Sequence, residues 1–157
     1  MDLYRLLGGI FQRTAQAEQL VAAFNAALAE LRGELWPPRR VLYLIWRKPW
    51  MSVSSATYIA AMLALVGWEV LPAHSVERYP KLELERSLLD AAELILFSSE
   101  PYTFRAKDVQ DFSRDYQVPA HKLHLIDGEM TAWYGSRAIP ALGYLQQFAR
   151  SITTLSA

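Results

Sequence analysis

Four short apolar segments, separated by longer helical patterns, place the strongest constraint on how this chain folds. The segments span residues 41–46, 68–71, 93–97 and 123–126. The first, VLYLIW, shows no polar alternation, which is typical of a strand buried on both faces of a parallel sheet. Strands that alternate with helices predict βαβ units with right-handed crossovers. We therefore expect an α/β three-layer sandwich, a parallel sheet of about four strands flanked by helices.

A long amphipathic helix is predicted ahead of this sheet, over residues 14–35. Its apolar residues recur at steps of three and four: Leu20, Phe24, Leu28, Leu31 and Leu35. Trp36-Pro37-Pro38 cannot continue a helix. We expect the apolar stripe to pack on the sheet, so that residues 1–157 form a single lobe, with the N-terminal segment and long helix over 1–36 and the α/β part over 37–157.

The remaining helices are predicted from their periodicity and end signals, over residues 54–67, 82–89, 104–116 and 139–152. Ser54 or Ser55 is suited to cap the first of them, and Gly67 supplies a left-handed stop. Pro140 falls in the first turn of the last helix, where proline is tolerated. Residues 47–53 and 72–80 are expected to be loops.

Composition excludes several classes of function. The chain has 16 Lys+Arg against 16 Asp+Glu, which argues against nucleic acid held by bulk electrostatics. The lack of cysteine excludes disulfides, thiolate metal sites and a Cys nucleophile, and three scattered histidines are too few for a metal cage. We expect neither a membrane span nor a signal peptide, because no apolar run approaches roughly 20 residues and the N-terminus lacks a basic region followed by an apolar stretch.

The loops that follow the predicted strands carry unusually many aromatic side chains. Ligands of open parallel sheets bind beyond the carboxyl ends of the strands, so these loops are where a site is expected. Their candidate ligand-binding residues are Trp50, Tyr79, Glu100, Tyr102, Asp127, Trp133, Tyr134 and Arg137. Large rigid rings with polar tips suit a wide apolar ligand or a partner surface. The alternative is that these rings cover the hydrophobic surface of the sheet.

Catalytic signatures are weak. Ser98, His124 and Asp127 supply the residue types of a triad, but there is no G-x-S-x-G motif, and His124 lies inside a predicted strand. The sequence also lacks a phosphate-binding glycine loop after the first strand. We expect no catalytic residues. Two alternatives stay open: a small α/β hydrolase-like enzyme with Glu100 or Asp127 as acid/base and Arg137 as an anion clamp, or an interaction module that uses the aromatic rim.

The ordered set VLYLIWRKPWMSVSSATYIAAMLALVGWEV, RYPKLELE, ILFSSEPYTFR and HLIDGEMTAWYGSRA resembles the carboxy-terminal lobe of class III (helical-backbone) substrate-binding proteins of ABC importers. Their cobalamin-binding and metal-chelate-binding group is the most similar, over about residues 15–148. In that family a long helix joins two lobes, and the ligand lies in the groove between them. The resemblance implies binding of cobalamin or a ferric chelate without catalysis, with no resident cofactor or metal.

The resemblance also assigns positions. Trp50, Tyr79, Asp127, Trp133 and Arg137 correspond to groove-lining residues. Glu85 falls where the family places an acidic residue that docks on arginines of the importer's membrane subunits, and a carboxylate on a short helix can bind a guanidinium bidentately. In the loop that begins with Glu100-Pro101-Tyr102, Thr103 stands where the family pattern has a proline. A periplasmic location is implied, although the expected lack of a signal peptide keeps the cytoplasm open.

The first lobe of the family has no counterpart here, since only about a dozen residues precede the long helix. An isolated lobe, a natural single-lobe relative and a truncated gene product all stay open. A lone lobe would expose the long helix and the rim, and an apolar N-terminal segment adds to that surface: Leu3, Leu6, Leu7, Ile10 and Phe11. We therefore predict a homodimer with two-fold symmetry.

Overall fold

Residues 2–155 are described by a computed structural model, in which the chain forms two compact units. A helical unit combines Met1–Leu35 with Trp133–Ala157, and a sheet unit comprises Trp36–Ala132. The single lobe expected over residues 1–157 stays a prediction.

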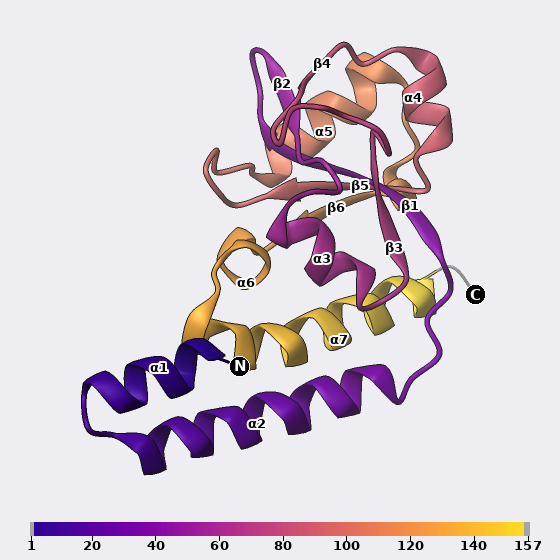
Figure 1. The fold of residues 1–157 in the computed structure, drawn as a ribbon. Coiled ribbons are helices and arrows are strands. Elements are labelled where there is room, and N and C mark those ends of the chain that lie inside the picture. The colour runs from indigo at the N-terminus through magenta and orange to yellow at the C-terminus, as the bar shows by residue number, and fades with distance from the viewer. Residues whose placement is uncertain (1, 156–157) are drawn as a thin grey trace. The chain divides into compact units, whose positions relative to one another are not determined.

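Four parallel strands form the centre of the sheet unit (Figure 1). They are β1 (Arg39–Trp46), β3 (Trp68–Leu71), β5 (Leu94–Ser98) and β6 (Leu123–Ile126). β1 pairs with β3 on one edge and with β5 on the other, and β6 follows β5. The four apolar segments therefore form the predicted parallel sheet.

Two short antiparallel strands extend this sheet and were not predicted. β2 (Trp50–Ser52) folds back along the carboxyl half of β1, and β4 (Lys81–Leu82) pairs with β2. β3 covers the amino half of the same β1 edge, so the sheet forks there. The buried Ser52 hydroxyl bridges the fork by donating to the carbonyl oxygens of Tyr43 (2.8 Å) and Leu71 (3.1 Å). A segment predicted to be a loop and the predicted start of a helix at Leu82 thus complete a six-stranded sheet.

Helices cover both faces of the sheet, as the three-layer prediction required (Figure 1). On one face, α4 (Arg86–Ala91) and α5 (Ala106–Tyr116) enclose a core that includes Leu44, Phe97 and Phe112. On the other face lie α3 (Tyr58–Ala64) and the unpredicted α6 (Gly128–Ala132). There the hydroxyl groups of Tyr43 and Thr131 share a 2.5 Å hydrogen bond. A 3-10 turn, η1 (Ala120–Lys122), leads into β6.

The helix ends correct several predictions. Thr57, not Ser54 or Ser55, caps α3: its hydroxyl accepts a hydrogen bond from the Ala60 amide at 3.2 Å. Gly67 has φ +73°, which confirms the left-handed stop. α4 begins at Arg86 instead of residue 82, because Lys81 and Leu82 are drawn into the sheet as β4.

The helical unit contains α1 (Asp2–Ile10), α2 (Thr14–Arg32), the 3-10 turn η2 (Gly135–Arg137) and α7 (Ala138–Leu155). The predicted long helix is α2, and it ends at Arg32, so the fully exposed Leu35 lies beyond it. Glu34 accepts hydrogen bonds from Gln146 and Arg150 of α7. Pro140 lies in the first turn of α7, as predicted.

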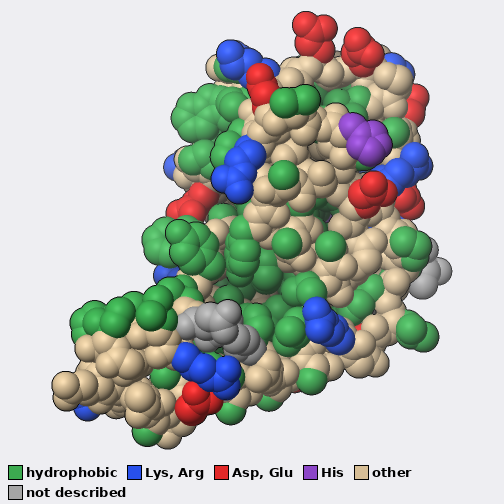
Figure 2. Space-filling model, in the orientation of Figure 1, with side chains coloured by type: hydrophobic (Ala, Val, Ile, Leu, Met, Phe, Trp, Pro, Cys, Tyr) green, Lys and Arg blue, Asp and Glu red, His purple; other side chains and the backbone are tan. Residues whose placement is uncertain are grey.

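α1 was not predicted as a helix, and it packs against α2 as a helical hairpin (Figure 1). Hydrophobic side chains gather along the side of α1 that faces away from α2 (Figure 2). Among residues 2–155, none of the helices has both the length and the apolar character needed to cross a membrane. The expectation that the α2 stripe packs on the sheet stays a prediction.

Candidate ligand-binding site

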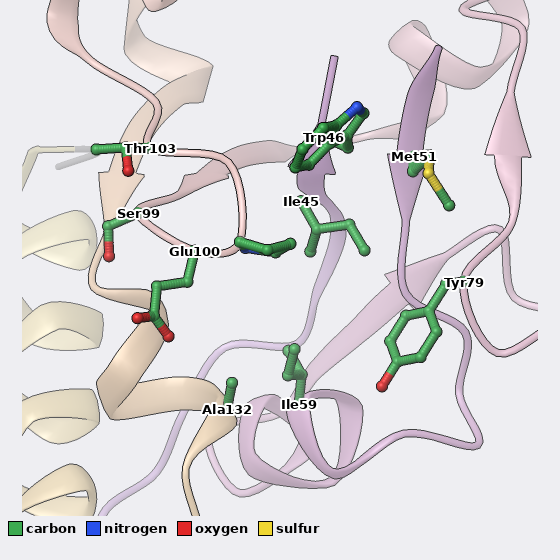
Figure 3. Close-up of a pocket in the computed structure, with 10 residues that line it drawn as sticks. Ile45, Trp46, Met51, Ile59, Tyr79, Ser99, Glu100, Thr103 and Ala132 are labelled. Atoms are coloured by element: carbon green, nitrogen blue, oxygen red, sulfur yellow. The ribbon is translucent and has the colours of Figure 1, made fainter. Parts of the chain in front are cut away.

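A pocket of about 640 Å³ opens in the sheet unit at the carboxyl ends of β1 and β5 (Figure 3). This is where a ligand is expected to bind an open parallel sheet, and the volume lies within the range of small-molecule sites. The lining residues are Ile45, Trp46, Met51, Ile59, Tyr79, Ser99, Glu100, Pro101, Thr103 and Ala132.

The pocket wall is largely apolar, with a few polar groups. Trp46 and Met51 come from the two strands of the β1–β2 hairpin, and Ile59 comes from α3. Figure 3 shows the Tyr79 ring opposite the Glu100 side chain, with the Tyr79 hydroxyl turned inward. Apolar walls with a small number of placed polar groups are typical of sites that orient a bulky small molecule. Of the predicted residues, the structure brings Tyr79 and Glu100 together here.

Trp50 lies behind this wall and not in it. Its ring stacks on Phe104 at 6.0 Å between centroids and meets Phe112 edge-on at 5.3 Å. Its indole nitrogen donates a 2.8 Å hydrogen bond to the Tyr116 hydroxyl. The ring therefore anchors the β1–β2 hairpin to α5. Its predicted contact with the ligand stays a prediction, and the structure gives it a packing role.

The turn between β1 and β2 is held by charge as well. The Arg47 guanidinium lies 5.8 Å from the centroid of the Trp50 ring and pairs with the Asp108 carboxylate of α5. Burial acts to lower the pKa of Arg47, but the hydrogen bond and the negative charge of Asp108 outweigh it, so the pKa is raised. The cation therefore stays charged and helps to fix the hairpin that carries Trp46 and Met51.

Tyr102 also supports the wall from outside the pocket. Its ring meets Trp46 edge-on at 5.7 Å and Phe104 at 4.6 Å, and its amide donates to the Ile45 carbonyl at 3.3 Å. These contacts join the loop after β5 to the end of β1. Tyr102 thus positions Trp46, a pocket residue that sequence reasoning missed.

Asp127 caps a helix. Its Oδ1 accepts hydrogen bonds from the amides of Glu129 (2.9 Å) and Met130 (3.3 Å) at the start of α6. The Ser99 hydroxyl accepts from the Gly128 amide at 2.9 Å, which ties α6 to the loop that carries Glu100. An aspartate directly ahead of a helix is a common N-cap residue, and this role was not predicted for Asp127. The ligand contact of Asp127 stays a prediction.

The three residues considered for a triad have other partners. The buried Ser98 hydroxyl accepts hydrogen bonds from the Tyr43 hydroxyl (3.1 Å) and the Glu100 amide (3.2 Å). His124 lies on β6, where Nε2 is 3.0 Å from the His121 carbonyl oxygen. Burial lowers the pKa of His124, although the His121 carbonyl acts in the opposite direction.

Trp133, Tyr134 and Arg137 belong to the helical unit. The Arg137 guanidinium lies 5.7 Å from the centroid of the Trp133 ring, and both Trp133 and Tyr134 are exposed. Because the relative position of the two units is not determined, the expectation that these residues share one rim with Tyr79 and Glu100 stays a prediction.

Glu85 is exposed at the N-cap position of α4. Its carboxylate accepts a long hydrogen bond from the Ser87 hydroxyl (3.4 Å), and its carbonyl oxygen accepts from the amides of Leu88 and Leu89. It is therefore placed on the surface, and its docking role stays a prediction. In the part of the chain that the structure describes, no cluster of three or more His, Asp or Glu residues is arranged to hold a metal ion.

Strand alternation explains why Met51, and not the predicted Trp50, lines the pocket. Neighbouring side chains of β2 point to opposite faces, so Trp50 enters the core beside α5 while Met51 faces the pocket. At the end of β1, Ile45 and Trp46 both line the pocket, although this segment was predicted only as a buried strand. The residues missed are Ile45, Trp46, Met51, Ile59, Ser99, Pro101, Thr103 and Ala132.

Comparison with known proteins identifies the fold. No protein-family model matches the chain, and no curated protein matches it. Solved structures do. A possible iron-binding (periplasmic solute-binding) protein from Staphylococcus epidermidis superposes with a TM-score of 0.75 at 13% identity, over 93% of this chain and 59% of its own.

Two further structures are similar. S. aureus IsdE, solved in complex with heme, gives a TM-score of 0.69 at 19% identity, over 93% of this chain and 62% of its own. The periplasmic vitamin B12 binding protein of Vibrio cholerae gives 0.66 at 14% identity, over 90% and 54%. The chain thus has the fold of class III substrate-binding proteins, as the sequence resemblance indicated. It spans little more than half the length of these structures.

Proposed function

We propose that this chain is the ligand-binding lobe of an ABC-transporter substrate-binding protein and that it binds cobalamin or a metal chelate without catalysis. The main support is the apolar pocket at the carboxyl ends of β1 and β5. Two proteins with the same fold are described as binding vitamin B12 or heme, which are bulky ligands of the class that such a pocket suits.

The exposure of the pocket rings supports a binding role. Trp46 is 39% exposed and Tyr79 is 50% exposed, so each presents a large apolar area for a ligand to cover. Glu100 and the Tyr79 hydroxyl would orient the ligand by hydrogen bonds. Tyr102 and Trp50 would act as positioning residues, because they hold the wall without lining it.

The enzymatic alternative has less support. Of the residues it needs, Glu100 lines the pocket, but Asp127 is used to cap α6 and Arg137 belongs to the helical unit. A binding role requires only a pocket of suitable shape and chemistry, and the apolar wall with Tyr79 and Glu100 supports it.

Calorimetric titration of the whole chain with cyanocobalamin, hemin and ferrioxamine B tests the proposal. Tyr79→Ala removes a ring that lines the pocket and should weaken binding by about 1 to 3 kcal/mol, or roughly 5- to 150-fold. Val76→Ala, at an exposed position outside the pocket lining, is the control. Failure of all three ligands to bind, or an unchanged affinity in Tyr79→Ala, would count against the pocket.

The partners in this proposal are the membrane subunits of an importer, reached through Glu85, with the protein in the periplasm. Glu85→Lys should abolish binding to those subunits while ligand affinity is unchanged, because it reverses the charge at an exposed site away from the pocket. Glu77→Lys, which makes the same change in an exposed loop, is the matched control. Normal subunit binding by the Glu85 variant would refute the docking assignment.

A further inference from the structure

The outer face of α1 is apolar and exposed. Leu6, Ile10 and Phe11 are 61%, 64% and 67% exposed, and Leu3 and Leu7 are more than two-fifths exposed. These residues recur at the three- and four-residue steps that align side chains along one side of a helix. Contiguous apolar surface of this kind on a folded chain marks an interaction site.

α1 is held firmly by its opposite face, so the exposure does not come from a loosely attached helix. Gly8 lies so close to α2 that a Cβ built on it would be 2.5 Å from the Ala17 Cβ. Arg5 pairs with Glu18 of α2 at 2.7 Å, and the Tyr4 hydroxyl donates a 2.5 Å hydrogen bond to the Gly135 carbonyl. The helix therefore presents its leucines outward from a fixed position.

The bond from Tyr4 to Gly135 brings a second exposed group beside α1. Trp133 and Tyr134 are 49% and 73% exposed, and Arg137 lies over the Trp133 ring. Trp, Tyr and Arg are the residue types most enriched at the energetic centres of protein interfaces. Together these residues form a surface that we call the α1 face: Leu3, Leu6, Leu7, Ile10, Phe11, Trp133 and Tyr134.

The area of the α1 face matches one side of a stable dimer. The exposed fractions of its seven residues add up to about four whole residues. At roughly 150 to 200 Å² for each large side chain, they present roughly 600 to 800 Å². A standard interface buries about 800 Å² on each partner.

Charge does not oppose a second copy of this chain as the partner, and the matching area makes that copy the partner the surface fits. Arg5 is already paired with Glu18 of its own chain, and the 16 positive and 16 negative residues give two copies no net repulsion. We infer that the α1 face is a homodimer interface, in which two copies meet through the same surface about a two-fold axis. This inference is independent of the proposed ligand, since none of the α1 face residues lines the pocket.

Sedimentation velocity of the whole chain across micromolar concentrations tests it. The wild-type chain should sediment as a dimer. Leu6→Glu with Ile10→Glu should raise the dissociation constant at least about 100-fold, because it places carboxylates in an apolar contact. Val76→Glu, at another fully exposed apolar position, should leave the dimer intact. A wild-type monomer at every concentration, or a dimer that persists in the double variant, overturns the inference.

A second measurement does not depend on the folding of that variant. The chain has no cysteine, so Gly9→Cys, on α1 but not among the α1 face residues and with open space around its Cβ, provides a single thiol for a spin label. Electron spin resonance should detect a defined distance between labels on two copies, and dilution with unlabelled chain should reduce the signal. Absence of that coupling, or binding of the chain to vesicles of phosphatidylglycerol in place of self-association, would show that a different partner covers the α1 face.

Discussion

Replacement of Gly128 by alanine tests how α6 is joined to the loop that carries Glu100. Gly128 is buried at the start of α6. A Cβ built on it would lie 2.5 Å from Ser98 Oγ, 2.8 Å from the Glu100 amide nitrogen and 3.0 Å from Glu100 Cβ. Real Cβ contacts essentially never approach so closely, so α6 or the loop must move.

The cost follows from what holds these neighbours in place. Ser98 Oγ is buried between the Tyr43 hydroxyl and the Glu100 amide, so it cannot turn away without losing hydrogen bonds. Overpacking costs about 1 to 3 kcal/mol, and an unsatisfied buried polar group costs about as much again. We expect Gly128→Ala to lower the free energy of unfolding by about 2 to 4 kcal/mol, or the Tm by roughly 5 to 15 °C.

Urea denaturation followed by circular dichroism measures this loss. Gly143→Ala is the matched control, because nothing lies within 4 Å of a Cβ built on Gly143 in α7. That substitution should stabilise the protein by up to about 1 kcal/mol, since alanine is the better helix former. If Gly128→Ala were as stable as wild type while Gly143→Ala behaved as expected, the close approach of α6 to the Glu100 loop would be refuted.

Three further predictions concern other parts of the chain. Gly8→Ala should speed amide hydrogen exchange in α1, because the new Cβ would clash with Ala17. Gly9→Ala has open space around its Cβ and should slow the exchange. Equal exchange rates in the two variants would contradict the packing of α1 on α2. Trp50→Ala should lower the free energy of unfolding by about 3 kcal/mol, because the ring packs on Phe104 and Phe112. Trp133→Ala removes a half-exposed ring and should lower it by under about 1 kcal/mol. Equal losses in urea denaturation would show that Trp50 is not a packing residue. Because burial lowers the pKa of His124 below its ordinary 6.5, its contribution to stability is fully present above that pH and is lost as the pH falls through the lower folded pKa. His124→Gln should flatten that part of the pH profile, so a His124→Gln profile identical to wild type would rule out this origin.

The sequence predicted the parts of the fold that have a strong periodic signal. β1 and β5 are continuous apolar runs, and α2 and α5 carry regular stripes, so each was located to within a few residues. β2, β4 and α6 span three, two and five residues, which is too short for periodicity to register. Their place depends on the tertiary pairing of β2 with β1 and on the Asp127 cap.

The predicted loops include two residues that line the pocket, and the ligand contacts of the other predicted residues stay predictions. Tyr79 and Glu100 line the pocket, but Trp50 and Tyr102 pack behind it. A loop residue has no preferred face, whereas a strand residue does, so the existence of β2 decides between Trp50 and Met51. That decision could not be made from the sequence, because the hairpin itself was not foreseen.

The fork in the sheet at β1 also determines how the sheet ends on that side. The outermost strand along β2 is β4, only two residues long, with the exposed Lys81 in it and Pro80, which has no amide hydrogen, just before it. The other branch of the fork ends in the four residues of β3. Short edge strands with lysine and proline nearby are poor templates for the backbone of another chain. This side of the molecule is therefore protected against strand-to-strand polymerisation.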